Sequence, residues 1–340
     1  IESFDVNMEE RELTVDKLIP EESTVVYKDF SIARDLQGPV QDIIDVYLDD
    51  MISIEHLSVE PFDIRLKEGT ELKCPPMRRI PRCFRPFVEE ETKRLMREGV
   101  IRKSSSWYHS PLVVVPKKGG KRRMCIDFRQ LNAATIPFVH PLPRIDDCFE
   151  SLSGAKVFGT LDLSHGFHQI PLKERITHLT AFCTSNDIFE YVRMPFGLAN
   201  APAHFQMVMN KVLRRLIGCC CIVYIDDVIV FGKTAAEFTQ NLEKVLECIA
   251  QYGLSLNPEK CILGVSQCEF LGFDISEKGR RVAQSRLRAI DKIREPRNKK
   301  ELRSFLGLIN FVRDFIPECS GISGPLQELI TSKLPYKWEM

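Results

Sequence analysis

The stretch Cys219-Cys220-Cys221-Ile222-Val223-Tyr224-Ile225-Asp226-Asp227-Val228-Ile229-Val230-Phe231 places two adjacent carboxylates between two apolar runs. Both flanks are short and rich in β-branched and aromatic residues, which predicts two buried strands. The aspartate pair between them predicts the turn of a β-hairpin. Two neighbouring carboxylates repel one another where the dielectric is low, so we expect a positive group, most simply a divalent cation, to lie over them.

Length and composition limit the classes of protein that the chain can belong to. It has 340 residues, 44% of them hydrophobic, which is enough for a core and more than one domain. No run approaches the ~20 apolar residues of a membrane span, and residues 1–10 lack a secretion-signal pattern. We therefore expect a cytoplasmic protein without membrane attachment, and the initial Ile1 leads us to expect a fragment or a processed product. Twelve cysteines without a CxxC pair favour reduced thiols over disulfides or zinc.

The net charge of zero hides a strong asymmetry along the chain. Residues 1–60 hold 16 acidic and 4 basic residues, a net charge of −12, which leaves +12 on residues 61–340. A basic main body is typical of nucleic-acid binding, although charges scattered over a solvated surface would give the same count. A Pro- and Arg-rich stretch, 74–82, is suited to follow a phosphate backbone, and a solvated connector is an equally good interpretation.

Hydrophobic periodicity predicts the other elements. We expect a basic hairpin from strands at 111–116 and 123–128, a strand at 157–163 and a short strand at 269–273. Helices are expected at 87–98, from Ala199–Pro202 to about 216, at 238–250, at 285–294, and from the N-cap Asn298 onward. A short amphipathic helix near 40–48 is also expected within the acidic segment. Strands interleaved with helices indicate an α+β fold with helices on one side of a sheet.

Asp162 near the end of its predicted strand adds a third carboxylate to the pair at 226–227. Three carboxylates from one sheet can hold two Mg²⁺ ions, a site that supports phosphoryl transfer. The alternative is that each aspartate is a turn residue, which would be preferred for Asp162 alone. The cations at 117–123, with Gly119 and Gly120 between them, offer a second place for phosphates, although such a hairpin tip is often only solvated.

Several ordered motifs give the chain a resemblance to a known family. The chain resembles the reverse transcriptases of long-terminal-repeat retrotransposons, most closely the gypsy type, from about Ser104 to the end. The matching segments are 104–113 (SSSWYHSPLV), 123–132 (RMCIDFRQLN), 141–147 (PLPRIDD), 161–170 (LDLSHGFHQI), 194–202 (MPFGLANAP), 224–227 (YIDD), 256–261 (LNPEKC), 270–272 (FLG) and 300–310 (KELRSFLGLIN).

The resemblance implies a role for each matching residue. Asp162, Asp226 and Asp227 are the implied catalytic residues and ligands of two Mg²⁺ ions, with Mn²⁺ as a substitute. Lys117, Lys118 and Arg123 would grip the deoxynucleoside triphosphate (dNTP), Phe167 would exclude a ribose 2′-OH, and Phe196 and Gly197 would line the nucleotide pocket. Primer or template contacts are implied for Gln169, Tyr224, Ile225, Leu271 and Gly272.

The resemblance also implies the architecture and the partners. We expect a right-hand polymerase: an acidic leader or linker (1–74), fingers and a palm with an antiparallel sheet (75–275), a thumb-like helical segment (276–325) and the start of a connection or RNase H-like region (326–340). The expected partners are an RNA or DNA template with its primer, dNTPs, and protease, RNase H and integrase domains outside this chain, with a cytoplasmic virus-like particle as the location.

Two other interpretations of the sequence stay open. The chain could be a catalytically silent remnant of a retroelement polyprotein that only binds nucleic acid. It could also be a DNA-templated polymerase, which uses the same metal chemistry and which only the family resemblance disfavours.

Overall fold

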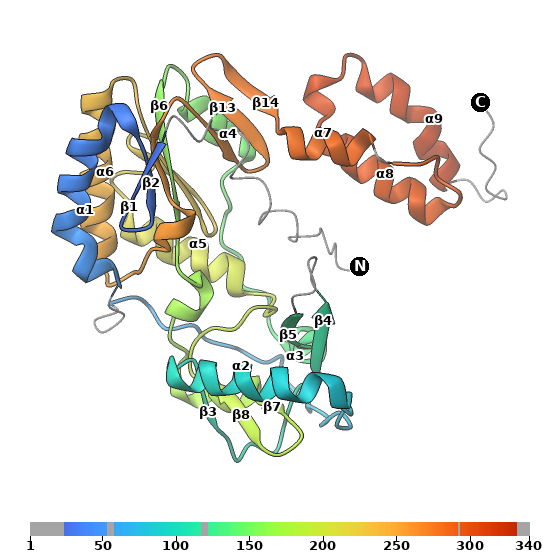
Figure 1. Cartoon of the computed structure of the whole chain (residues 1–340). Coiled ribbons are helices and arrows are strands. Elements are labelled where there is room, and N and C mark those ends of the chain that lie inside the picture. Colours follow the sequence, from blue (N-terminus) through green and yellow to red (C-terminus); the bar gives the residue numbers. More distant parts are fainter. Residues whose placement is uncertain (1–23, 53–57, 117–121, 292, 332–340) are drawn as a thin grey trace. The chain divides into compact units, whose positions relative to one another are not determined.

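The computed structural model describes residues 24–52, 58–116, 122–291 and 293–331, and the chain divides into two compact units, residues 1–268 and 269–340 (Figure 1). Unit 1 is built on a six-stranded sheet in the order β1-β2-β11-β6-β10-β9. All neighbouring strands are antiparallel except β2 and β11, which are parallel. The strands are β1 (Thr24–Tyr27), β2 (Phe30–Ala33), β6 (Val157–Asp162), β9 (Cys221–Tyr224), β10 (Asp227–Gly232) and β11 (Ile262–Val265).

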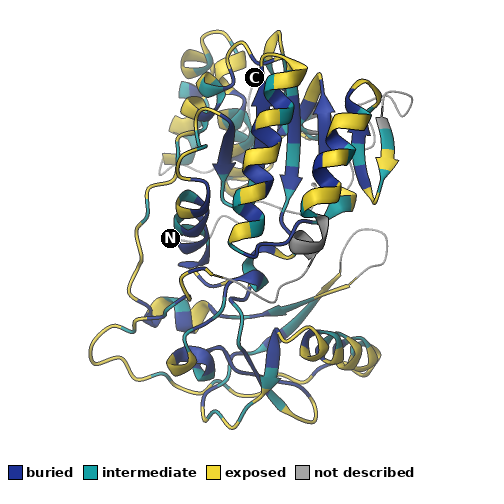
Figure 2. Ribbon diagram, turned by 90° about the vertical axis from the view of Figure 1, so that its left-hand side faces the viewer, coloured by how far each residue is buried: buried dark blue, intermediate teal, exposed yellow. Residues whose placement is uncertain are grey.

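Helix α6 (Ala235–Gln251) packs on β10, β6 and β11, and α1 (Gln37–Ile52) packs beside α6. The first turn of α6 is fixed by Thr234, whose side chain accepts a hydrogen bond from the Glu237 backbone N–H, as an N-cap residue should. The helix sides that face the sheet are buried and the opposite sides are exposed (Figure 2). Helix α5 (Ala201–Val212) packs against β9. The expected α+β fold is thus present.

Residues 24–52 differ from the expected acidic leader. They form β1, β2 and α1, and they join the main sheet of unit 1. The segment is rich in acidic residues, but it also carries apolar side chains that are buried in unit 1: Phe30, Ile32, Val40, Ile43 and Ile44. Net charge is a property of the surface, so it does not exclude a buried face on the same segment.

The rest of unit 1 contains smaller sheets and short helices. A three-stranded sheet has the order β3-β8-β7, and β4 and β5 form the predicted hairpin. The elements are β3 (Ile101–Lys103), β4 (Leu112–Pro116), β5 (Arg122–Ile126), β7 (Phe182–Cys183), β8 (Ile188–Tyr191), α2 (Arg85–Arg97), α3 (Arg129–Ala134) and α4 (Ile145–Ser151). The 3-10 helices of unit 1 are η4 (Arg34–Leu36), η5 (Arg82–Phe84), η7 (Gly166–Gln169), η8 (Glu174–Thr180) and η9 (Pro258–Lys260).

In its described residues, unit 2 combines strands of the sheet β12-β13-β14 with the helices α7, α8 and α9. Its elements are β13 (Phe273–Ser276), β14 (Gly279–Val282), α7 (Gln284–Asp291), α8 (Lys299–Phe311), η10 (Arg313–Phe315) and α9 (Cys319–Thr331), and β12 (Gln267–Phe270) begins at the boundary with unit 1. The predicted N-cap Asn298 is confirmed, because its side chain accepts a hydrogen bond from the Glu301 N–H at 2.9 Å. The single strand expected at 269–273 is wrong, since a turn at Leu271 and Gly272 divides it into two strands.

Candidate active site

Asp162 and Asp227 lie directly opposite each other on the adjacent antiparallel strands β6 and β10. Residues paired in this way have Cα atoms about 4.5–5.5 Å apart and side chains on the same face of the sheet. Gly159 on β6 shows which face this is. A Cβ atom at Gly159 would lie 2.9 Å from the Phe238 ring, so position 159 faces α6. Because side chains alternate along a strand, Asp162 points away from α6, and so does its partner Asp227. The sheet therefore presents two carboxylates on the face opposite α6.

The turn of the hairpin is one residue earlier than predicted. Tyr224 pairs with Asp227, so Ile225 and Asp226 form the turn and Asp227 is the first residue of β10. Ile225 has a φ of 58°, a left-handed conformation that costs an L-residue about 1–2 kcal/mol and is rare for β-branched side chains. Asp226 stands directly after this strained residue and directly before Asp227.

Asp162 is surrounded by groups from the segment that precedes β11. The ammonium of Lys260 lies 3.9 Å from its Oδ1, with both side chains partly exposed. The Asp162 backbone C=O accepts a hydrogen bond from the Asn257 N–H at 2.8 Å, and its N–H points at the Cys261 thiol. Lys260 brings a positive charge to this face. No role was predicted for it, because its position beside Asp162 depends on a contact between segments far apart in the sequence.

The three aspartates offer the right donor atoms for Mg²⁺, since carboxylate oxygens are the protein ligands this ion prefers. Within the described ranges, no three His, Cys, Asp or Glu side chains lie close enough together to hold one metal ion. Like charges keep carboxylates apart unless a cation offsets their repulsion. The residues therefore fit the metal in chemical type, while the convergence of all three is an expectation.

Aromatic and cationic side chains gather where the nucleotide pocket is expected. The ring of Phe167 lies 5.0 Å from that of Phe196 and 5.3 Å from that of Phe205, measured between centroids. The guanidinium of Arg123 lies 5.5 Å above the Phe196 ring, in cation–π contact. Phe167, Phe196 and Arg123, predicted separately from distant motifs, are thus close together.

Gly197 and Asn132 fix the backbone beside Phe196. Gly197 has a φ of 93°, which favours glycine. The Asn132 side chain donates to the Gly197 carbonyl at 2.9 Å and accepts from the Ala199 N–H at 2.9 Å. No role was predicted for Asn132 from the sequence, although this residue ends the 123–132 motif. Its two bonds hold the backbone on the C-terminal side of Phe196.

His168 lies beside the same aromatic group. Its ring meets Phe196 edge-on at 5.2 Å and lies 6.0 Å from the ring of His165. Burial, followed by the nearby His165 charge, lowers the pKa of His168 to about 4. This imidazole is therefore neutral at physiological pH, and the cations near the pocket do not include it.

The other residues predicted to contact nucleotide, primer or template lie in different environments, and some lie outside the described residues. Lys117 and Lys118 lie outside the described residues. Gln169 is buried, and its amide bonds to the Ser164 carbonyl at 2.7 Å and to the Ser255 carbonyl and N–H, each at 2.8 Å. Tyr224 is half-buried and shares the sheet face of Asp227. Gln169 is thus bonded within the protein.

Leu271 and Gly272 are described within unit 2 alone. They form the turn between β12 and β13, with φ values of 53° and 79°. A Cβ atom on Gly272 would lie 3.2 Å from the Phe311 ring and 3.3 Å from the Arg286 side chain. This close approach explains a glycine at position 272.

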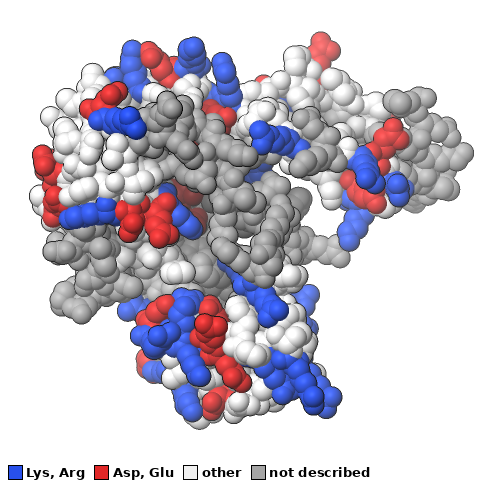
Figure 3. All heavy atoms as spheres, viewed as in Figure 1, with Lys and Arg blue, Asp and Glu red and all other residues white. Residues whose placement is uncertain are grey.

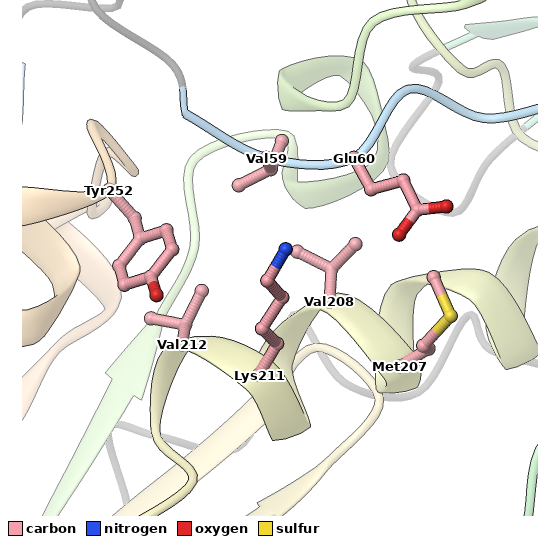
Figure 4. A pocket seen from close by; sticks show the side chains of 7 residues that line it. All are labelled: Val59, Glu60, Met207, Val208, Lys211, Val212 and Tyr252. Carbon is pink, nitrogen blue, oxygen red and sulfur yellow. The ribbon is translucent and has the colours of Figure 1, made fainter.

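Two hollows of unit 1 contain none of the predicted site residues. A cavity of about 30 Å³ beside α5 has room for a water molecule, and its lining is shown in Figure 4: Val59, Glu60, Met207, Val208, Lys211, Val212 and Tyr252. An open hollow of about 450 Å³ is lined by Leu66, Thr70, Glu71, Leu72, Trp107, His178 and Leu179. The carboxylate pair lies on a sheet face that neither hollow includes.

Comparison with solved structures defines the class of fold. The chain is similar to the foamy viral protease-reverse transcriptase in complex with double-stranded DNA, with a TM-score of 0.81 and 27% identity over 94% of this chain and 56% of that one. It is similar to the same enzyme with an RNA/DNA hybrid, with a TM-score of 0.78 and 26% identity over 94% of this chain and 43% of that one. The fold is that of a right-hand polymerase.

Sequence comparisons give the family. Residues 115–275 match the family described as reverse transcriptase (RNA-dependent DNA polymerase). The Pol polyprotein of transposon opus from Drosophila melanogaster is 42% identical over 254 residues, which cover 73% of this chain and 25% of that protein. The Tf2-3 polyprotein of Schizosaccharomyces pombe is 34% identical over 251 residues, covering 74% and 19%.

The chain belongs to the reverse transcriptase family of retrotransposon Pol polyproteins, as the sequence motifs predicted. It spans about a quarter or less of the length of the curated relatives that it matches.

Proposed function

We propose that this chain is an RNA-directed DNA polymerase that adds deoxynucleotides to a primer 3′-OH. The observation that carries the proposal is the pairing of Asp162 with Asp227 on one sheet face, with Asp226 in the adjoining turn. Two carboxylates paired on one sheet face repel one another, so a catalytic use explains them better than a structural one.

In this proposal, Asp162, Asp226 and Asp227 hold two Mg²⁺ ions, and Mn²⁺ can replace them. When bound, such a metal pair activates the attacking 3′-OH and offsets the charge that develops on the phosphates. The protein itself places the reactants. Arg123, whose guanidinium lies over the Phe196 ring, would bind a phosphate oxygen, and Lys117 and Lys118, which lie outside the described residues, would add to this positive charge.

Phe167 would act as the gate against a ribose 2′-OH. Its ring packs against the rings of both Phe196 and Phe205, so these contacts would oppose its movement when an extra oxygen approaches. Phe196 and Gly197 would form the wall of the nucleotide pocket. The bulk of one fixed ring is enough to discriminate between the two sugars.

Template and primer would be held by charge and by the turns. Residues 75–134 contain 15 Lys and Arg against 5 Asp and Glu. On the face shown in Figure 3, Lys and Arg side chains gather over α2 and the β3-β8-β7 sheet, with Asp and Glu among them. Tyr224, Ile225, Leu271 and Gly272 are the proposed primer contacts. For Gln169, the bonds to Ser164 and Ser255 favour support of the loop after Asp162 over direct contact.

The remaining proposals concern the whole polyprotein. Protease, RNase H and integrase domains would lie outside this chain, which would work inside a cytoplasmic virus-like particle. Within the described residues, the helices are too short or too polar to span a membrane.

Primer extension tests the proposal. The purified chain is mixed with an RNA template, a DNA primer, dNTPs and Mg²⁺, and the length of the primer is followed while nucleic-acid binding is measured in parallel. We expect extension on RNA and, at some rate, on a DNA template of the same sequence. Binding without extension on either template would favour the silent remnant, and extension on DNA alone would favour a DNA-templated polymerase.

A further inference from the structure

The strained turn that carries Asp226 is held by a buried side chain from α5. The Oε1 atom of Gln206 accepts a hydrogen bond from the Ile225 N–H at 2.6 Å. Its Nε2 atom donates to the Val223 carbonyl at 3.3 Å. Gln206 is fully buried, with 0% of its surface exposed. One amide group therefore binds the backbone on both sides of Tyr224, where strand β9 enters the turn.

The backbone needs this support. Among the described non-glycine residues with positive φ, Ile225 is the only β-branched one. Local propensity therefore opposes this turn, and it persists only where surrounding contacts fix it. Rotation of the Tyr224–Ile225 peptide would relieve the strain, but it would also break the hydrogen bond from the Ile225 N–H to Gln206. The same rotation would redirect the following residue, Asp226.

A second amide fixes the orientation of the first. Gln206 Nε2 also donates to Asn210 Oδ1 at 2.8 Å, one helical turn along α5. The Nδ2 atom of Asn210 lies 3.0 Å from His140 Nε2, which accepts the bond when the imidazole carries its proton on Nδ1. Each donor thus faces an acceptor along the row His140, Asn210, Gln206 and Ile225. This order leaves Gln206 Oε1 to accept from the turn.

We propose that Gln206 is a positioning residue for catalysis, acting through the Ile225–Asp226 turn, with Asn210 as its support. The inference rests on the proposed polymerase function. Gln206 does not touch substrate. It restrains the turn so that Asp226 stays beside Asp227, and misplacement of a reacting group by about 1 Å can cost roughly 100-fold in rate.

The chain offers a matched control. Asn241 on α6 is also buried, and its amide donates to the Phe231 carbonyl at 2.9 Å, near the far end of strand β10. Gln206→Met and Asn241→Leu each remove one buried amide that binds this hairpin. They differ in which end of the hairpin they release. A residue with only a structural role would behave like Asn241 in both experiments below.

The first experiment measures the rate of primer extension as a function of dNTP concentration. We expect Gln206→Met to lower kcat roughly 10–100-fold, with KM for dNTP changed less than about threefold. Asn210→Leu should lower kcat less, in the same direction, and this milder variant covers the case in which Gln206→Met does not fold. Asn241→Leu should keep kcat within about threefold of the wild type, even if its thermal stability falls as much as that of Gln206→Met.

The second experiment does not depend on activity. Hydrogen–deuterium exchange at the Ile225 amide should be slow in the wild type and in Asn241→Leu, and at least about tenfold faster in Gln206→Met. If the wild type extends primers and Gln206→Met keeps both its kcat and slow exchange, the inference is wrong. If the wild type extends no primer while Gln206→Met exchanges faster, the polymerase proposal fails and the restraint on the turn stands.

Discussion

At the scale of single residues, Phe167 gives the sharpest test of substrate choice. Its ring packs against the rings of Phe196 and Phe205, so replacing it with a small side chain should open space beside both rings. We predict that Phe167→Ala raises the ratio of kcat/KM for ribonucleotides over deoxynucleotides by roughly 10–200-fold, the range expected for one steric contact. Phe167→Tyr keeps the ring and should retain the discrimination. An unchanged ratio in Phe167→Ala would contradict the gate.

His168 makes a prediction about pH. Burial lowers its pKa to about 4 from an ordinary value near 6.5, so between these values the unfolded chain binds a proton that the folded chain excludes. Stability should therefore decrease as the pH falls from 6.5 toward 4, by about 2 kcal/mol at pH 5 relative to pH 7.5. Urea unfolding at both pH values should show a smaller decrease in His168→Gln than in the wild type. Equal decreases would mean that His168 is not the group responsible.

At the scale of elements, β10 and α6 pack so closely at Gly232 that there is no room for a side chain. A Cβ atom on Gly232 would lie 2.5 Å from the Phe238 backbone nitrogen, so Gly232→Ala must displace the start of α6. We predict a loss of about 1–3 kcal/mol in the free energy of unfolding. Gly38→Ala is the control, since nothing lies within 4 Å of its Cβ position in α1 and alanine favours a helix. Thermal unfolding should show a lower Tm for Gly232→Ala and an unchanged or higher Tm for Gly38→Ala.

The helices and strands also show which parts of the fold could be predicted from the sequence. Apolar runs predicted β9 and β10 because their periodicity is local, and Asn298 was predicted as a cap for the same reason. The hairpin turn was misplaced by one residue because Asp-Asp favours turns locally, whereas the observed turn depends on a bond between Gln206 and Ile225, 19 residues apart. In residues 24–52 the helix near 40–48 was expected, whereas β1 and β2 were missed because the acidic residues around them masked the buried apolar residues of β2.

The site shows the same division between local and distant information. Ordered motifs identified Asp162, Asp227, Arg123 and Phe196, whose arrangement the structure then supplied. The supporting residues Asn132, Gln206 and Lys260 could not be assigned in advance, because their roles depend on bonds and distances between distant segments. Sequence motifs therefore predicted the candidate catalytic residues, whereas the residues that hold them in position were found only in the structure.

At the scale of the whole molecule, charge should dominate nucleic-acid binding. Residues 61–340 carry a net charge of +12, so binding should release counterions from the phosphate backbone. If six to ten phosphates are contacted, the affinity for a primer–template should fall about 10³–10⁵-fold between 50 and 200 mM salt. Fluorescence anisotropy measures this slope, and circular dichroism at both salt concentrations controls for unfolding. A fall of less than tenfold would exclude a binding mode based on phosphates.

The central proposal is that the carboxylates on the sheet face opposite α6 perform the chemistry. Single-turnover primer extension by Asp227→Asn tests it most directly, with Asp187→Asn as control because the Asp187 side chain forms a surface ion pair with Lys103. We predict that Asp227→Asn loses at least about 10³-fold in rate while its Tm and its affinity for primer–template stay near those of the wild type, and that Asp187→Asn remains active. Extension by Asp227→Asn at the wild-type rate would contradict the account.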